Sequence, residues 1–114
     1  MNQTDKSKLI PQIHFIEKEL PFLINAVLDT SKILFTIDRQ DVPETSRELL
    51  FKIGVNIFKR EEEAVSFSEL ARIRNTVAHR YLDLRWNDII RFFQIAEKLL
   101  PAFLDHMKKQ IQKQ

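Results

Sequence analysis

ELARIRNTVAHRYLDL, residues 69–84, carries the pattern that decides how this chain folds. At about 100° per residue around a helix, its apolar side chains fall on one narrow stripe that must face a core: Leu70, Ile73 and Val77. Asn75 and His79 lie four residues apart on nearly the opposite face, with Arg72 beside them. The stretch therefore predicts an amphipathic helix with an unusually reactive set of side chains on its polar side.

Length and composition predict one small helical domain. The 114 residues correspond to a single domain, 1–114, and 44% of them are hydrophobic, which is enough for a core. One glycine and four prolines are too few for the many tight turns of a sheet protein, so long helices with few connections fit better. The lysine- and glutamine-rich tail from about residue 108 predicts a fraying helix end.

Cysteine content, hydropathy and charge narrow the class of protein further. The chain lacks cysteine, which removes zinc–thiolate sites and suits a reducing cytoplasm, the predicted location. No run of about 18 apolar residues is evident and the N-terminus is polar, so neither a membrane span nor a signal peptide is predicted. The net charge of +2 does not by itself indicate nucleic-acid binding. Basic residues nevertheless form a local cluster, which could attract phosphate: Arg72, Arg74, Arg80, Arg85 and Arg91.

Apolar residues recur at three- and four-residue steps and predict four helices, at about 6–38, 41–60, 66–81 and 83–109. Pro21 either kinks the first helix or begins another one, which gives four to five helices in total. Helices joined by short connections form an up-down bundle, so the predicted fold class is all-α.

Capping signals and one glycine add local detail. Asp41, ahead of a Pro-Glu pair, is the predicted cap of the second helix. Ser66 with Glu69 three residues later matches a capping box and starts the third helix, which leaves the glutamates at 61–63 in a solvated loop. Gly54 lies in the middle of the second helix, where glycine costs stability, and a close helix crossing would explain it.

The polar residues of the quoted stretch fit one kind of reaction. The His79 imidazole can take or give a proton near neutral pH, and the Arg74 guanidinium can bind phosphate oxygens in a fork. No metal-ligand cluster accompanies them, because His14 and His106 have no paired ligand spacing. Together these groups fit metal-free cleavage of an RNA phosphodiester, in which the 2′-hydroxyl is the nucleophile.

Arg74 and His79 cannot easily act together from one straight helix. Five residues separate them, which places them about 140° apart around the axis. Either the helix distorts near its end, or a second copy of the chain completes the site across a two-fold axis, as in the common symmetric dimers. Tyr81, seven residues after Arg74, lies with it on the flank of the core stripe.

The order Arg74, four residues, His79, one residue, Tyr81 resembles the signature of the HEPN superfamily (higher eukaryotes and prokaryotes nucleotide-binding domain). It is most similar to the HepT-type toxins of HEPN/MNT toxin–antitoxin pairs. The segment LLFKIGVNIF, residues 49–58, is similar to the isoleucine-glycine helix that precedes the signature in this group, although Val55 stands where many relatives carry glutamate. The resemblance covers about residues 45–105.

This resemblance implies a helical bundle that forms a homodimer near the signature helix and cleaves RNA without a metal or other cofactor. Arg74 and His79 would be the catalytic pair, and Asn75, with the basic residues Arg72 and Arg80, would position the substrate. In some such type VII-like pairs, the partner is an MNT-type nucleotidyltransferase antitoxin. That partner would silence the toxin by attaching AMP to Tyr81.

Two alternatives remain open on the residues alone. One is a non-catalytic HEPN module that binds a nucleotide or a nucleotidyltransferase and keeps the signature only for its interface. The other is a plain helical bundle in which Arg74 pairs with an acidic side chain and His79 has no role. Growth arrest on expression without a partner separates the toxin from both, because only the toxin predicts it.

Overall fold

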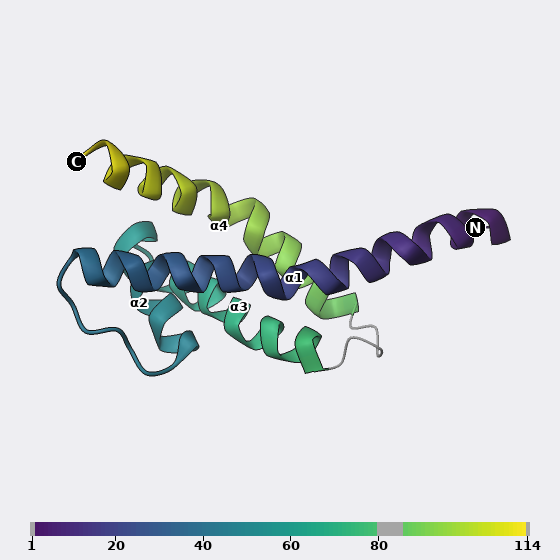
Figure 1. Ribbon diagram of the computed structural model, residues 1–114, viewed down its shortest axis with the longest axis horizontal. Helices are drawn as coiled ribbons and strands as arrows, with labels where there is room; N and C mark the ends of the chain where they lie inside the picture. Colours follow the sequence, from purple (N-terminus) through teal and green to yellow (C-terminus); the bar gives the residue numbers. More distant parts are fainter. Residues whose placement is uncertain (1, 80–85, 114) are drawn as a thin grey trace.

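The computed structural model describes residues 2–79 and 86–113, and that part of the chain is all-α, with four helices and no strand. The helices are α1 (Gln3–Ile37), α2 (Ser46–Phe58), α3 (Glu61–His79) and α4 (Trp86–Gln112). They form an elongated bundle with extents of 54 × 28 × 23 Å (Figure 1). α3 packs against each of the other three helices, so the predicted signature helix lies at the centre of the fold.

α1 is one continuous helix of 35 residues that contains both Pro11 and Pro21. Its first turn is capped by Asn2, whose side chain accepts a hydrogen bond of 2.8 Å from the Asp5 backbone N–H. Pro21 does not begin a new helix, because Leu20 and the buried residues that follow it pack into the core and hold the backbone in helical register. The first turns of α1 are exposed and project beyond the other helices (Figure 1).

α1 also changes one expectation about hydropathy. By length and composition alone, Gln3–Ile37 contains a stretch apolar enough to cross a membrane, which the sequence analysis did not find. Only a third of that stretch is buried inside the fold, and the core helix of a soluble protein and a signal sequence both pass the same test of length and composition. Leu20, Ile24 and Leu28 are among the most deeply buried residues of the chain. This part of α1 therefore belongs to the core of the helical bundle.

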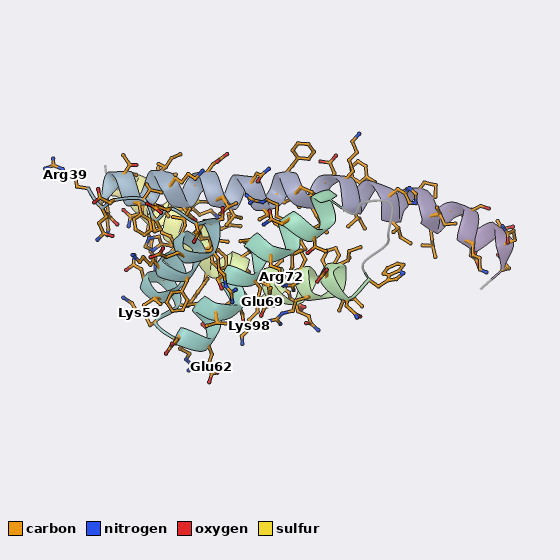
Figure 2. The ribbon with its side chains drawn as sticks, turned by 90° about the horizontal axis from the view of Figure 1, so that it is seen from below. Arg39, Lys59, Glu62, Glu69, Arg72 and Lys98 are labelled. Carbon is orange, nitrogen blue, oxygen red and sulfur yellow. The ribbon has the colours of Figure 1, made fainter. Side chains whose placement is uncertain are left out.

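The start of α2 differs from its prediction. The cap is Thr45 rather than Asp41, and its hydroxyl accepts a hydrogen bond of 3.1 Å from the Glu48 backbone N–H. Threonine satisfies one of the free N–H groups of the first turn, so the helix begins after it. α1 and α2 are each followed by a residue in the left-handed region, Arg39 with φ of 57° and Lys59 with φ of 63° (Figure 2).

The predicted close crossing at Gly54 is confirmed. A Cβ atom added to this glycine would lie 2.8 Å from the Cα of Ala64 and 3.0 Å from its Cβ. Real Cβ atoms do not approach backbone that closely, so only glycine allows α2 to pack at this distance on α3. The crossing fixes the N-terminal half of α3 against α2.

The start of α3 corrects two predictions. The helix begins at Glu61, so the three glutamates are its first turn and not a solvated loop. Their carboxylates suit the positive end of the helix dipole. The capping box at Ser66 is also wrong, because Ser66 and Glu69 lie inside the helix and their side chains bind Arg91 of α4 instead.

Side chains from all four helices form one core. Phe67 of α3 packs against Phe58 of α2 and Phe103 of α4, with ring centroids 5.2 and 5.4 Å apart. The predicted core stripe of α3 is confirmed where its side chains are described, since Leu70 is 1% exposed and Ile73 is 0% exposed. The side chain of Val77 lies outside the described residues. Burial of this stripe sets which face of α3 turns outward.

Candidate functional site

The polar face of α3 follows directly from its buried stripe. Because Ile73 points into the core, Arg74 falls on the flank and is half-buried, whereas Arg72 and Asn75 are exposed. This agrees with the faces that the helical periodicity predicts. Each of these polar side chains then finds a different kind of partner.

The Arg74 guanidinium is held by two amide oxygens from two helices. Its Nε and Nη2 donate to Oδ1 of the neighbouring Asn75 at 3.3 and 3.0 Å. Its Nη1 donates to Oδ1 of Asn25, on α1, at 3.3 Å. Asn25 lies 49 residues away and has no motif around it, so it could not be predicted from the sequence. Only the packing of α1 on α3 brings it to the site.

The neutral partners leave Arg74 chemically available. Amide oxygens accept hydrogen bonds without cancelling the guanidinium charge, and an arginine has five N–H groups to give. Three of them donate to Asn75 and Asn25, and among the described residues no carboxylate pairs with Arg74. Among the described residues, one N–H on each of Nη1 and Nη2 has no acceptor. Two such donors on a fixed plane match two oxygens of a phosphate.

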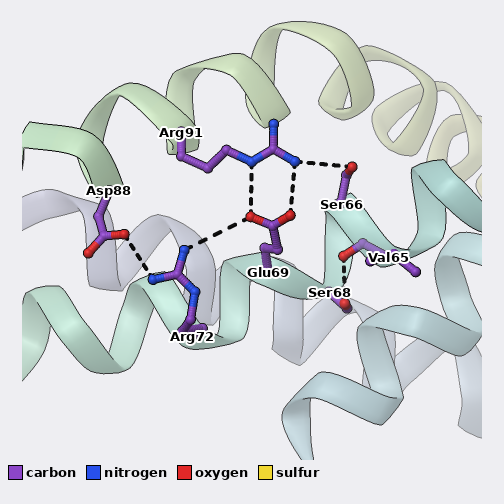
Figure 3. Close-up of polar contacts among 7 residues, drawn as sticks. All are labelled: Val65, Ser66, Ser68, Glu69, Arg72, Asp88 and Arg91. Atoms are coloured by element: carbon purple, nitrogen blue, oxygen red, sulfur yellow. Dashed lines mark hydrogen bonds and ion pairs between the residues drawn. The ribbon is translucent and has the colours of Figure 1, made fainter.

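Arg72 and Arg91 have acidic partners instead (Figure 3). Arg72 pairs with Asp88 at 2.9 Å and lies 3.9 Å from a Glu69 oxygen. Arg91 donates two hydrogen bonds of 2.9 Å to the two oxygens of Glu69, and a third of 3.1 Å to the Ser66 hydroxyl. These contacts join α3 to the first turns of α4. We call Ser66, Glu69, Arg72, Asp88 and Arg91 the α3–α4 ion-pair cluster.

The electrostatics of the α3–α4 ion-pair cluster are mutually reinforcing. The hydrogen bonds from Arg91 lower the pKa of the Glu69 carboxyl; partial burial opposes this, and the charges of Arg91, Arg72 and Arg47 add to it. The same hydrogen bonds raise the pKa of Arg91. Glu69 and Arg72 lie together on α3 (Figure 2). The basic cluster predicted from the sequence is therefore partly neutralised by Glu69 and Asp88.

The remaining predicted site residues lie at the end of α3 and just beyond it. His79 is the last residue of α3, and its side chain is outside the described part of the chain. Arg80 and Tyr81 also lie outside the described residues. Their predicted roles stay predictions. Within residues 2–79 and 86–113, no group of three histidine, aspartate or glutamate side chains is placed to hold a metal ion.

The helical backbone of α3 bears on how Arg74 and His79 could cooperate. α3 remains α-helical as far as His79, so the five residues between the two positions separate them by about 140°. Of the two arrangements open to the sequence analysis, distortion of the helix before its end is not observed. Completion of the site by a second copy stays a prediction.

Comparison with known proteins gives one match. A family model described as "Ribonuclease HepT-like" matches residues 4–109, which is nearly the whole chain. No curated protein and no solved structure matches this chain. The family match covers α2 and α3 and nearly all of α1 and α4, and it includes Asn25, the quoted stretch and the α3–α4 ion-pair cluster.

Proposed function

We propose a specific activity for this chain, which belongs to the HepT-like ribonuclease family of the HEPN superfamily. It is a metal-independent endoribonuclease that cleaves RNA with Arg74 and His79, and it acts as the toxin of a type VII-like HEPN/MNT toxin–antitoxin pair. The family match supports a ribonuclease function of the HEPN type. The cleavage site, the toxin role and its control are our proposal.

One observation carries the proposal. Arg74 is the arginine of α3 that amide oxygens hold, and its charge is not cancelled by any carboxylate among the described residues. Arg72, two residues earlier, is paired with Asp88 and with Glu69. A guanidinium that is fixed in position and still charged suits a site that must bind a phosphate and stabilise the charge that develops on it.

The proposed reaction is an internal transesterification. The 2′-oxygen attacks the scissile phosphorus, the bond to the 5′-oxygen breaks, and the products are a 2′,3′-cyclic phosphate and a 5′-hydroxyl. His79 takes the proton from the 2′-hydroxyl or gives one to the departing 5′-oxygen. Arg74 holds the phosphate oxygens, and Asn75 fixes the plane of its guanidinium. Arg80 contributes positive charge along the path of the RNA, whereas the predicted contribution of Arg72 is reduced by its pairing with Asp88.

A homodimer would complete this site. The separation of about 140° on a regular helix prevents Arg74 and His79 of one α3 from gripping the same phosphate easily. A two-fold axis near the end of α3 brings a second signature to the same cleft. We therefore propose that the RNA binds between two copies of the chain, in the cytoplasm.

Tyr81 is the proposed point of control. It follows His79 by two residues, so an AMP group attached to its hydroxyl by an MNT-type nucleotidyltransferase antitoxin would place a phosphate and a nucleoside beside the catalytic pair. The added negative charge repels RNA, and the added volume fills the cleft. Co-expression with such an antitoxin should add one AMP to the wild-type protein and none to Tyr81→Phe, as measured by mass spectrometry. AMP on another residue would contradict this role.

RNA cleavage in the presence of EDTA tests the central proposal. Purified protein should cut RNA and leave a 2′,3′-cyclic phosphate, and His79→Ala should abolish the cut. His14→Ala is the matched control, because His14 is an exposed histidine of α1 that belongs to no proposed site. Cleavage that persists in His79→Ala, or that is lost equally in His14→Ala, would remove His79 from the mechanism.

A further inference from the structure

We infer that Asn25 of α1 is a positioning residue for Arg74, and that a neutral side chain at this position is what keeps Arg74 able to bind a phosphate. This inference rests on the proposed ribonuclease function and extends it to a second helix. It concerns how the guanidinium is held before substrate arrives, and it assigns to α1 a role in the site besides packing.

The geometry shows two amides that hold one guanidinium from two sides. Asn75 accepts from the edge formed by Nε and Nη2, and Asn25 accepts from Nη1. Asn75 is the adjacent residue of α3 and moves with Arg74, so it cannot by itself fix Arg74 relative to the rest of the protein. Asn25 can do so, because α1 packs on α3 independently of that local contact.

The backbone of Asn25 is itself well anchored. The preceding residue, Ile24, is 0% exposed, and Leu28 one turn later is 2% exposed, so this part of α1 is fixed in the core. Asn25 itself is exposed and lies on the flank of this buried stripe. An acceptor on a rigid helix restricts a long and flexible arginine side chain in advance, which reduces the entropy lost when a ligand binds.

The chemistry of the acceptor matters as much as its position. In the α3–α4 ion-pair cluster, Glu69 binds Arg91 through two hydrogen bonds and cancels its charge. A carboxylate at position 25 would hold Arg74 at least as strongly but would compete with phosphate for the same guanidinium. The amide of Asn25 supplies the hydrogen bond without the charge. The site therefore needs an acceptor at position 25 that is polar and neutral.

Two substitutions at this position separate the inference from a merely structural role. Asn25→Ala removes the acceptor and should lower kcat/KM for RNA by about three- to ten-fold. Asn25→Asp keeps an acceptor but adds a charge, and it should lower kcat/KM by about ten-fold or more, mainly through a higher KM. If the contact served only to tie α1 to α3, Asn25→Asp would retain activity and Asn25→Ala would be the weaker enzyme.

Asn56→Asp is the matched control, since Asn56 is an exposed helical asparagine on α2 that makes no side-chain hydrogen bond to Arg74. It adds the same negative charge and should leave kcat/KM within about two-fold of wild type. Thermal unfolding should show all these variants folded. Equal losses in Asn25→Asp and Asn56→Asp would overturn the inference, because net charge alone would then account for them.

A readout that needs no cleavage distinguishes failure of this inference from failure of the proposed function. The NMR signal of the Arg74 Nη1–H group, which donates to Asn25 and is assigned by its loss in Arg74→Lys, should shift in Asn25→Ala and stay in place in Asn56→Ala. If wild-type protein cuts no RNA, the proposed function fails, and a shifted signal still supports the positioning contact. If the signal does not move in Asn25→Ala, the inference about Asn25 is overturned, whatever the cleavage assay shows.

Discussion

The N-terminal part of α3, residues 61–73, and the part that begins at Arg74 are held by the rest of the protein in different ways. The first part is clamped by α2, which approaches to van der Waals contact at Gly54, and by α4, through the α3–α4 ion-pair cluster. The second part begins with an arginine that reaches α1 through a single amide acceptor. Within two residues of the same helix, the partner of an arginine thus changes from a carboxylate, at Arg72, to amides, at Arg74.

This difference shows that an arginine's role depends on its partner and not on its place in a basic cluster. Arg72, Arg74 and Arg91 look alike in the sequence, where they form one basic run. Carboxylates hold Arg72 and Arg91, so their main effect is to attach α4 to α3. Amides hold Arg74, and no carboxylate among the described residues pairs with it. Residues 61–73 of α3 are packed against α2 and α4, and they therefore fix the position of the helical turn that carries Arg74.

The largest expected effect is the loss of activity when the Arg74 guanidinium is removed. Arg74→Ala should lower kcat/KM for RNA by about 100- to 1,000-fold, because it removes the group that stabilises the charge on the phosphate. The free energy of unfolding should change by less than about 1 kcal/mol, since the lost hydrogen bonds are exposed and join neutral acceptors. Cleavage assays and denaturant unfolding measure the two effects. A large loss of stability with a small loss of activity would reverse the roles assigned to the two parts of α3.

A second test removes the ion pair between Glu69 and Arg91, which holds residues 61–73 of α3 against α4. Glu69→Gln removes the carboxylate that binds Arg91 and should destabilise the protein by about 1–2 kcal/mol, a value between those of exposed and buried pairs. Activity should fall only as far as the unfolded fraction rises. Glu97→Gln on the exposed face of α4 is the control and should change stability by less than about 0.5 kcal/mol in denaturant unfolding. Equal effects of the two substitutions would mean that the α3–α4 ion-pair cluster contributes nothing to stability.

The close crossing at Gly54 gives a third and smaller effect. Gly54→Ala should lower the free energy of unfolding by about 1 kcal/mol. The cost of the clash with Ala64 exceeds the gain in helix propensity from glycine to alanine. Asn56→Ala, on an exposed position of the same helix, should instead be neutral or slightly stabilising. Thermal unfolding compares the two. A more stable Gly54→Ala protein would show that the crossing does not need glycine.

The smallest expected effect is a dependence of stability on pH that comes from Glu69, in the first part of α3. The pKa of Glu69 is lower in the folded protein than in the unfolded chain, so its contribution is present above the unfolded pKa and is lost as pH falls through the folded value. As pH falls from neutral through the unfolded pKa and then the folded one, wild type should therefore lose more stability than Glu69→Gln. Parallel curves for the two proteins would contradict the lowered pKa. Asn25 and Asn75, which hold Arg74, do not titrate and add no such slope.

Some of these features were predictable from the sequence because they depend on neighbours along the chain. Helical periodicity placed Leu70 and Ile73 in the core and Arg72 and Asn75 outside, and the lone glycine indicated the crossing with α3. Capping signals were less reliable. Ser66 and Glu69 have the spacing of a capping box, but the same spacing puts two polar groups on one helical face, where Arg91 of α4 binds both.

The sequence by itself determined that this chain is a helical domain and which side of the signature helix faces the core, because periodicity of apolar residues encodes both. It also placed an arginine and a histidine at the spacing of the family signature. Only the tertiary structure decided which of the described arginines pair with carboxylates and which one is held by amides. That outcome depends on Asn25 reaching Arg74 and on Glu69 and Asp88 reaching Arg91 and Arg72, and such contacts form between helices far apart in the chain. No local pattern records them, since each helix would look the same whichever partner packed against it.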